Sequence, residues 1–268
     1  MGTLSEDHLA AFLGIRPEAL ADLYREVDDY LLQHWSPERA IYVFGEEDDA
    51  LPLDAIGAII RGKKAMGDVL YMFGGDEGKE RSAALFERLA ATLDAVFPVA
   101  RPWGMPEQLV FGEEGVTSAS ATVDLYDWYQ FLNHLGGGYA FDREREGTAR
   151  YFAQHRPDLL EAWNELADEA LLGIMEYHLT SEQRLVRTVA YEDGQILDDQ
   201  LTLATMAMFI TTAGNLYGKG NAFARPGAWA EGDPDIAEQS RQLFDLSFAH
   251  WDLLKVSAAQ QTSSRSTP

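Results

Sequence analysis

Apolar residues recur at helical spacing along most of this chain, and that periodicity constrains the fold more than any other feature of the sequence. Residues 79–97 are an example, because Leu85, Leu89, Leu93 and Phe97 stand four residues apart. A spacing of three to four residues places such side chains on one face of an α-helix. The same kind of pattern predicts helices over residues 17–35, 53–73, 79–97, 121–135, 157–179, 201–216 and 235–255, and a short helix that ends at residue 155.

Proline and glycine separate these helices. Pro98 stops the helix that ends at Phe97, because proline lacks the N–H that a continuing helix needs. Residues 98–120 are rich in proline, glycine and small polar residues, which predicts a long loop or a pair of short strands. The segment 184–197 contains the turn-forming pair Asp193-Gly194, and it fits a hairpin and a helix–turn–helix equally well.

We therefore expect an all-α fold, a single-domain bundle of about nine or ten helices with at most one short β-hairpin. Residues 201–216 are apolar nearly all round, which is typical of a helix buried on every side, so we place that helix at the centre. The domain is expected to cover residues 1–258. Residues 259–268 are small and polar, and they predict a disordered C-terminal tail.

The charge balance concerns the environment of the protein rather than its reaction. The chain has 44 acidic and 21 basic residues, a formal net charge of −23 at pH 7. The acids are spread along the chain, and such a charge favours solubility at high ionic strength, where salt screens their repulsion. We therefore expect a halophilic protein of a salt-rich cytoplasm, with inorganic cations at its acidic surface. Nucleic acid is not expected as a partner, because the sequence has no cluster of basic residues.

Several classes of chemistry lack support in the sequence. There is no cysteine, which excludes disulfides and thiolate catalysis. No histidine pattern typical of a helical metal site is present, so neither a metal nor a cofactor is expected. The N-terminal residues do not resemble a signal peptide, and the longest apolar stretch, Leu201–Leu216, is shorter than the ~20 residues that span a bilayer. We expect a soluble, cytoplasmic protein without membrane contacts.

Two short motifs are weak. Residues 57–64 match Gly-x4-Gly-Lys of a phosphate-binding loop, but Lys64 stands where serine or threonine would hold magnesium. A helix with glycines at close contacts explains the same residues. Arg150 and His155 have an Arg-x4-His spacing that occurs in some helical ribonucleases, but two common residue types match so loose a pattern by chance.

The favoured site region runs from Asp124 to Asp142, where aromatic and polar side chains alternate. On a helical wheel Asp127 and His134 fall on one flank, two turns apart, and they are the candidate acid–base pair. Side chains with an apolar body and a polar tip are typical of a cleft lining. The expected ligand-binding residues are Asp124, Tyr126, Trp128, Tyr129, Asn133, Tyr139, Arg143, Arg150, Asn215 and Lys219. Arg143 or Arg150 would clamp an anion, and Asn215 with Lys219 would form a second wall.

Two functions are compatible with these residues. The first is an accessory or chaperone-like protein that binds a protein partner or a small ligand in an aromatic-lined cleft. The second is an enzyme in which Asp127 and His134 act as acid and base, in a cleft formed by residues 124–155. In the alternative without a functional site, the aromatic residues pack in the core and the polar groups are solvated.

Overall fold

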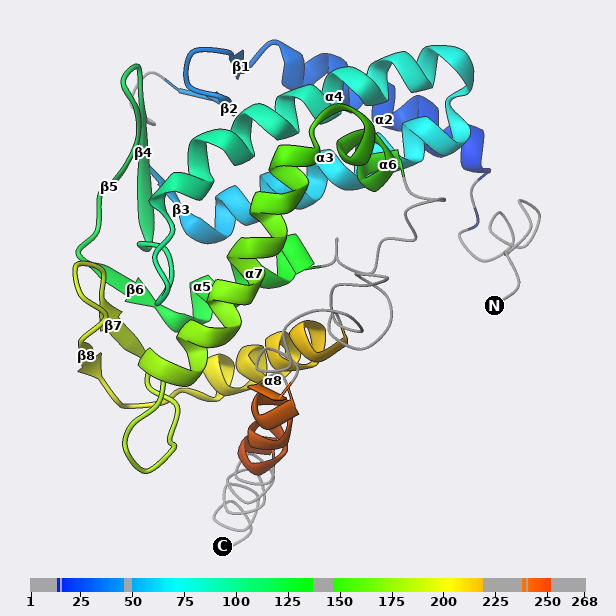
Figure 1. The fold of residues 1–268 in the computed structure, drawn as a ribbon. Coiled ribbons are helices and arrows are strands. Elements are labelled where there is room, and N and C mark those ends of the chain that lie inside the picture. Colours follow the sequence, from blue (N-terminus) through cyan, green and yellow to red (C-terminus); the bar gives the residue numbers. More distant parts are fainter. Residues whose placement is uncertain are drawn as a thin grey trace, which may run out of the picture.

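The structure is a computed structural model that describes residues 14, 16–45, 50–136, 147–218, 238–239 and 241–251. In these ranges the chain folds into long helices with three small antiparallel sheets (Figure 1). The labelled α-helices are α2 (Pro17–Leu32), α3 (Leu53–Phe73), α4 (Gly75–Val96), α5 (Leu125–Gly136), α6 (Gly147–His155), α7 (Pro157–Tyr177) and α8 (Leu203–Gly218). A 3-10 turn, η1 (Phe97–Val99), follows α4, and residues 241–251 are helical.

Eight short strands form the sheets. The strands are β1 (Trp35–Ser36), β2 (Ile41–Tyr42), β3 (Ala50–Pro52), β4 (Gln108–Gly112), β5 (Gly115–Ser118), β6 (Thr122–Asp124), β7 (Thr188–Ala190) and β8 (Ile196–Asp198). They pair as β1-β2, β3-β4-β5 and β6-β7-β8, and every pairing is antiparallel. The two three-stranded sheets lie together at one end of the helical layer (Figure 1).

The expectation of an all-α bundle with nine or ten helices is wrong, because the described chain is mixed α/β with eight helices. The physical reason is strand length. Strands of two to five residues are too short to show the alternation that identifies a strand. Their hydrogen bonds also join distant segments, as where Leu51 of β3 stands opposite Leu109 of β4. Local sequence patterns contain no information about such pairings.

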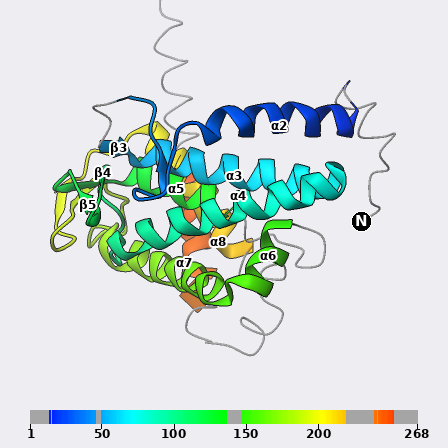
Figure 2. The same ribbon diagram turned by 90° about the horizontal axis from the view of Figure 1, so that it is seen from above.

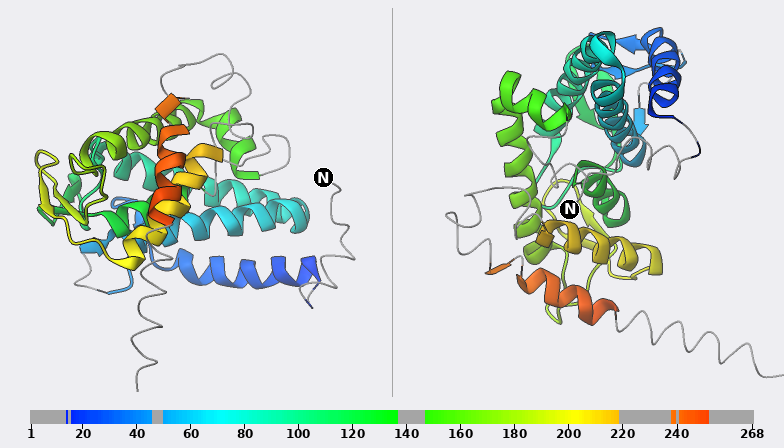
Figure 3. Two further views of the ribbon diagram at one scale, coloured as in Figure 1. Left: turned by 90° about the horizontal axis from the view of Figure 1, so that it is seen from below. Right: turned by 90° about the vertical axis from the view of Figure 1, so that its right-hand side faces the viewer.

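The central helix of the fold is α3, not α8. Helix α3 packs against α2, α4, α5 and α6, and Figure 2 shows it running beside α4 with α2 on its outer side. Helix α8 packs on α5, next to the helical residues 241–251 (Figure 3). Its outer side is open, and Leu203 is 46% exposed. Alanine, threonine and methionine make α8 apolar all round in composition, but only one side is buried.

The main apolar core contains residues from Ile41 to Leu243, and a second, smaller cluster of Ala21, Met66, Leu70 and Leu85 lies between α2, α3 and α4. Two of the five lysines are buried as well, because Lys63 and Lys64 of α3 are 2% and 6% exposed. The Lys63 ammonium donates to Thr92 Oγ1 at 2.7 Å and lies 4.2 Å from the Trp35 ring centroid. Burial lowers the pKa of Lys63 well below its ordinary value. Within the described residues, this lysine is held by a hydroxyl, the Arg88 carbonyl and aromatic rings, and not by a carboxylate.

Other expectations fare better. Helix α3 has the predicted bounds, and Pro17 and Pro157 begin α2 and α7 as predicted. Residues 184–197 form a hairpin, whose turn uses Gly194 at φ 73. In the described ranges no helix combines the length and the apolar character needed to cross a bilayer. The one-domain organisation stays a prediction, and the tail at 259–268 lies outside the described residues.

Candidate functional site

The favoured segment from Asp124 begins at the end of β6 and continues as α5. The Tyr126 backbone N–H donates to Asp124 Oδ1 at 2.8 Å, which satisfies one of the free N–H groups at the start of the helix. Trp128 and Leu135 are fully buried and Leu132 is 3% exposed, so this face packs in the core. Trp128 therefore does not line an open cleft.

Tyr129 is also in the core, where it joins a buried polar network. Its hydroxyl donates to Nδ1 of His178 at 3.0 Å, and Nε2 of His178 donates to the backbone oxygen of Trp103 at 2.8 Å. Burial lowers the pKa of His178 to about 4, so the ring is neutral near pH 7, as this pattern of donors requires. The network ties α5 to the end of α7 and to the loop at residue 103, which is a structural role.

The other polar flank of α5 faces α8. The Asn133 amide donates to Sδ of Met208 at 2.9 Å, and the Thr212 hydroxyl donates to the backbone oxygen of Tyr129 at 3.2 Å. Thr211 returns its hydroxyl to the Ala207 carbonyl in its own helix. These polar groups are thus hydrogen-bonded within the fold.

Asp127 lies in an acidic cluster at the sheet end of the molecule. Burial, with a further contribution from the nearby carboxylates of Asp124, Asp54 and Glu107, raises its pKa to about 6. Asp124 also lies 3.7 Å from the Arg187 guanidinium. Among the residues that the structure describes, no three histidine or acidic side chains are grouped to hold a metal ion. The cluster therefore gives a carboxyl group that titrates close to neutral pH, without a metal centre.

His134 packs against α3 at Gly57, where an added Cβ would lie 2.8 Å from Cδ2 of the imidazole. Both ring nitrogens are buried and lack a hydrogen-bond partner. Burial lowers the pKa of His134, the Arg61 charge lowers it further, and Asp54 opposes this. In the described part of the chain no hydrogen bond or ion pair joins His134 to Asp127. Asp54 is the one acid whose charge reaches both.

The remaining sequence candidates are scattered. Residues 57–64 lie inside helix α3, so the phosphate-loop match is a helix with a close glycine contact. Tyr139, Arg143 and Lys219 lie outside the described residues, and so does the side chain of Asn215 in α8. Tyr126 is half-buried on α5. Arg150 is on α6, at a different place in the fold from α5.

Arg150 belongs to a pocket between α4 and α6, with a volume of ≈ 330 Å³. The pocket is lined by Tyr71, Lys79, Ser82, Ala83, Phe86, Glu87, Gly147, Arg150, Tyr151, Gln154 and His155. Helix α6 is fixed on α3 at its first turn, because the backbone N–H and the hydroxyl of Thr148 both donate to Asp68 Oδ1 at 2.7 Å. Gly147 lets the backbone pass against Tyr71. The wall that carries Arg150 is thereby anchored to the central helix.

Aromatic rings form one side of this pocket. The ring centroids of Phe86 and Tyr151 are 5.4 Å apart, and those of Tyr151 and His155 are 4.7 Å apart. Phe86 itself is packed onto α3 at Gly67, where a Cβ would lie 2.2 Å from the ring. The rings are therefore held in place from behind by the core.

Two polar groups of the pocket have no partner within the described residues. Ser82 is fully buried and its hydroxyl makes no hydrogen bond. Arg150 is exposed, and neither a hydrogen bond nor an ion pair holds its guanidinium in the described ranges. Lys79 pairs with Asp76 at 3.4 Å, but both side chains are exposed, and such pairs contribute little.

Sequence reasoning found Arg150 and His155 and missed Lys79, Ser82 and the aromatic residues of α3 and α4. The one available signal was Lys79, a rare lysine in an acidic chain. Its closeness to Arg150 depends on the packing of α6 on α4, which no local pattern reveals.

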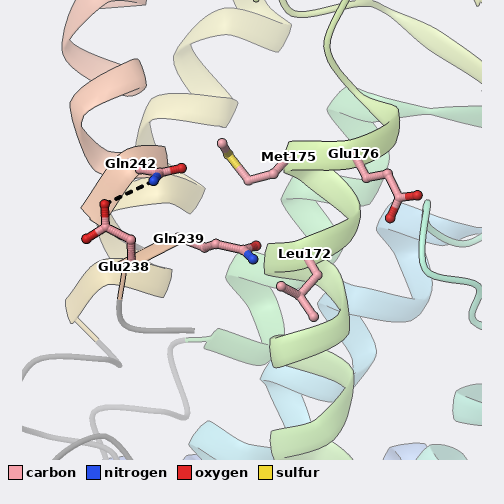
Figure 4. A pocket seen from close by; sticks show the side chains of 6 residues that line it. All are labelled: Leu172, Met175, Glu176, Glu238, Gln239 and Gln242. Atoms are coloured by element: carbon pink, nitrogen blue, oxygen red, sulfur yellow. Dashed lines mark hydrogen bonds between the residues drawn. The ribbon is translucent and has the colours of Figure 1, made fainter. Parts of the chain in front are cut away.

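A larger hollow of ≈ 490 Å³ lies between α7 and the helical residues near 240 (Figure 4). It is lined by Leu172, Met175, Glu176, Glu238, Gln239 and Gln242. Gln239 extends toward Leu172, while Glu238 accepts a hydrogen bond from Gln242 at 3.0 Å. Its polar lining is acids and amides, and Glu238 is already engaged by Arg241. It presents fewer free groups to a ligand than the pocket between α4 and α6.

Comparisons with protein-family models, with curated proteins and with solved structures find no match to this chain.

Proposed function

We propose that this protein binds a small molecule in the pocket between α4 and α6. The observation that carries the proposal is the coincidence, in one cavity of ≈ 330 Å³, of packed aromatic rings with polar groups that have no partner among the described residues. Small-molecule sites are concave, largely apolar and equipped with a few polar groups that fix orientation. A buried polar group without a partner also needs an explanation, and a ligand or an ordered water at the pocket floor supplies one for Ser82.

A pocket-filling variant tests this proposal. Ala83 lines the pocket, so Ala83→Phe is expected to occupy it, whereas Ala153→Phe adds the same ring to an exposed position of α6 outside the lining. A set of small aromatic compounds is screened by ligand-observed NMR. We expect binding to the parent and to Ala153→Phe, and loss of binding in Ala83→Phe. Equal binding to both variants would place the ligand elsewhere and reject the proposal.

An accessory, chaperone-like role is the wider class to which we assign such binding. This part of the proposal requires a protein partner. Affinity purification of the tagged protein from its own cytosol at molar KCl, followed by mass spectrometry, tests it. A stoichiometric protein partner supports the accessory role, while a retained small molecule alone favours a carrier or an enzyme.

Catalysis by Asp127 and His134 is the second candidate function. It is favoured by the pKa of Asp127, which burial and the neighbouring carboxylates raise to about 6, because an acid–base group works best when its pKa lies near the working pH. The expected result is that His134→Ala keeps the fold but abolishes turnover of a substrate found in cell extract. Turnover unchanged in His134→Ala would reject this candidate.

We also propose that the protein works in a salt-rich cytoplasm. The net charge of −23 supports this, because the Debye length falls from ~10 Å at 0.1 M salt to ~3 Å at 1 M and the repulsion between acids falls with it. The free energy of unfolding is therefore expected to rise steadily with KCl over this range. Chemical denaturation at several KCl concentrations measures it, and a flat profile would reject the proposal.

A further inference from the structure

We infer that the ligand of the α4–α6 pocket is an organic anion, a planar ring that carries a carboxylate or phosphate group. This inference rests on the proposed function, since it names the chemical class of the molecule that the pocket binds. It is carried by the charges of the lining, by the guanidinium of Arg150, which no described residue pairs, and by the arrangement of the rings.

The charges of the pocket run against those of the chain. Acidic residues outnumber basic ones 44 to 21 in the whole protein. The lining has the basic residues Lys79 and Arg150 and the single acid Glu87, together with His155. At this pocket basic side chains thus outnumber acidic ones, whereas the larger hollow beside α7 is lined by acids and amides. This reversal indicates a site for a negative group.

Arg150 is the best placed of these cations to bind an anion. A guanidinium offers five N–H donors in a planar fork that matches the two oxygens of a carboxylate or phosphate. No acid neutralises Arg150 within the described chain, so a ligand need not displace a partner. Lys79 is a second cation, since its exposed pair with Asp76 at 3.4 Å is weak.

The rings specify the other half of the ligand. Phe86 and Tyr151 are tilted by 46° with centroids 5.4 Å apart, and Tyr71 lines the same pocket. Aromatic pairs prefer offset or edge contacts at these separations, so a planar ring can join this group by further contacts of the same kind. A flat ring against these side chains would leave its charged substituent for the basic residues of the lining.

Glu87 limits the charge of the ligand. Burial is the largest cause that raises the pKa of the Tyr151 hydroxyl, and the charge of Glu87 is the second. The Glu87 carboxylate therefore lies near that ring. Repulsion from Glu87 disfavours a ligand with several negative charges beside Tyr151. Removing this carboxylate is therefore expected to strengthen the binding of an anion.

The test compares three probes of one size class in molar KCl, where long-range repulsion by the acidic surface is screened. Benzoate and phenyl phosphate carry the two candidate groups, and benzyl alcohol carries the ring without charge. We expect benzoate or phenyl phosphate to bind at least about tenfold more tightly than benzyl alcohol, as charge-assisted hydrogen bonds imply. The better of the two anions identifies the group. Inorganic phosphate alone is expected to bind more weakly, because it lacks the ring.

Arg150→Gln is expected to weaken the preferred anion about tenfold and to leave benzyl alcohol unchanged, while Glu87→Gln strengthens the anion. Arg184→Gln is the control, because Arg184 is exposed, pairs with Glu182 and lies outside the pocket. The inference would be overturned if benzyl alcohol and the anions bound with equal affinity. It would also be overturned if Arg150→Gln changed the binding of the anion and of benzyl alcohol equally. In both cases the proposed binding of a small molecule in the pocket would remain supported. If no ring compound binds, charged or neutral, the proposed function fails and the inference fails with it.

Discussion

Helix α5 and the α4–α6 pocket are built from the same kinds of side chain, but they use them differently. On α5, Tyr129 is bonded to His178 and Asn133 to Met208, whereas the ring nitrogens of His134 are buried without a hydrogen-bond partner in the described chain. In the pocket Ser82 has no hydrogen bond and Arg150 has no partner in the described chain. A mixture of aromatic and polar residues therefore does not by itself identify a site. What distinguishes the pocket is that Ser82 and Arg150 line one cavity together with aromatic rings, whereas His134 is packed against Gly57 of α3.

The largest expected effect concerns the buried network on the α5 side. Burial lowers the pKa of His178 from 6.5 to about 4, so the unfolded chain binds a proton in that window and the folded chain does not. Stability from this group is present above pH 6.5 and is lost as pH falls toward 4, by up to about 3 kcal/mol. Urea unfolding of the parent and of His178→Gln, measured from pH 7.5 to 4, is expected to show a flatter profile in the variant.

His155→Gln is the control for this measurement, because His155 is an exposed histidine of the pocket. Its profile is expected to follow that of the parent. A profile as flat in His155→Gln as in His178→Gln would contradict the assignment of the acid sensitivity to the buried network.

The next effect compares three glycines of helix α3. Gly67→Ala places a Cβ 2.2 Å from the Phe86 ring, so we expect a loss of about 1–3 kcal/mol and weaker ligand binding in the pocket. Gly57→Ala presses instead on His134 and should leave the pocket unchanged. Gly62 has no atom within 4 Å of an added Cβ, so Gly62→Ala should gain up to about 1 kcal/mol. Thermal unfolding and probe binding separate the three variants, and equal binding by Gly57→Ala and Gly67→Ala would contradict the comparison.

A smaller effect concerns the acidic cluster beside α5. The pKa of Asp127 is raised from 3.8 to about 6, so the folded state holds its proton more tightly than the unfolded state does. The resulting stability is present below pH 3.8 and is lost as pH rises through about 6. Asp127→Asn is therefore expected to stabilise the protein at pH 8, by about 1 kcal/mol once solvent screening is allowed for. Asp199→Asn is the control, because Asp199 is exposed, and its free energy of unfolding should show no such gain. Similar gains in both variants would contradict the assignment of the effect to the raised pKa of Asp127.

The smallest effect is expected at Ser82, and it is measured against Thr92, a second buried hydroxyl of helix α4. Thr92 accepts from Lys63 and donates to the Ala40 carbonyl at 2.5 Å, so Thr92→Val should cost about 1–3 kcal/mol. Ser82 has no hydrogen-bond partner in the described part of the chain, and Ser82→Ala should change stability by less than about 1 kcal/mol, in the stabilising direction. Denaturant unfolding measures both. A Ser82→Ala variant as damaged as Thr92→Val would show that Ser82 is engaged in the folded protein.

The sequence predicts the helices well where a long apolar stripe meets a clear stop signal. Helix α3 has the bounds expected from its periodicity, and Pro157 begins α7 as proline at a first helical position predicts. The sheets could not be predicted from the sequence, because strands such as β3, Ala50–Pro52, are short and pair with a distant segment. The central position of α3 was also hidden, since its own residues do not show how many neighbours cover it.

The site was predicted only in part, for a related reason. Arg150 is singled out by its charge, but the sequence groups it with Asp127 and His134, which lie on α5. The structure places it with Lys79, a residue that is distant in the chain and that joins it only because α6 packs on α4. Residue type indicates which groups can bind a ligand, whereas the packing of the helices decides which of them come together.

The burial of lysines in α3 has a practical consequence for labelling. Lys63 and Lys64 are 2% and 6% exposed, while the side chain of Lys79 is 56% exposed. Within the described chain, an amine-reactive dye can therefore reach one lysine side chain, and that lysine lies at the pocket. Peptide mapping separates this adduct from any at Lys219 or Lys255. A dye on Lys79 would report occupancy of the pocket by a change in emission, in the unmutated protein.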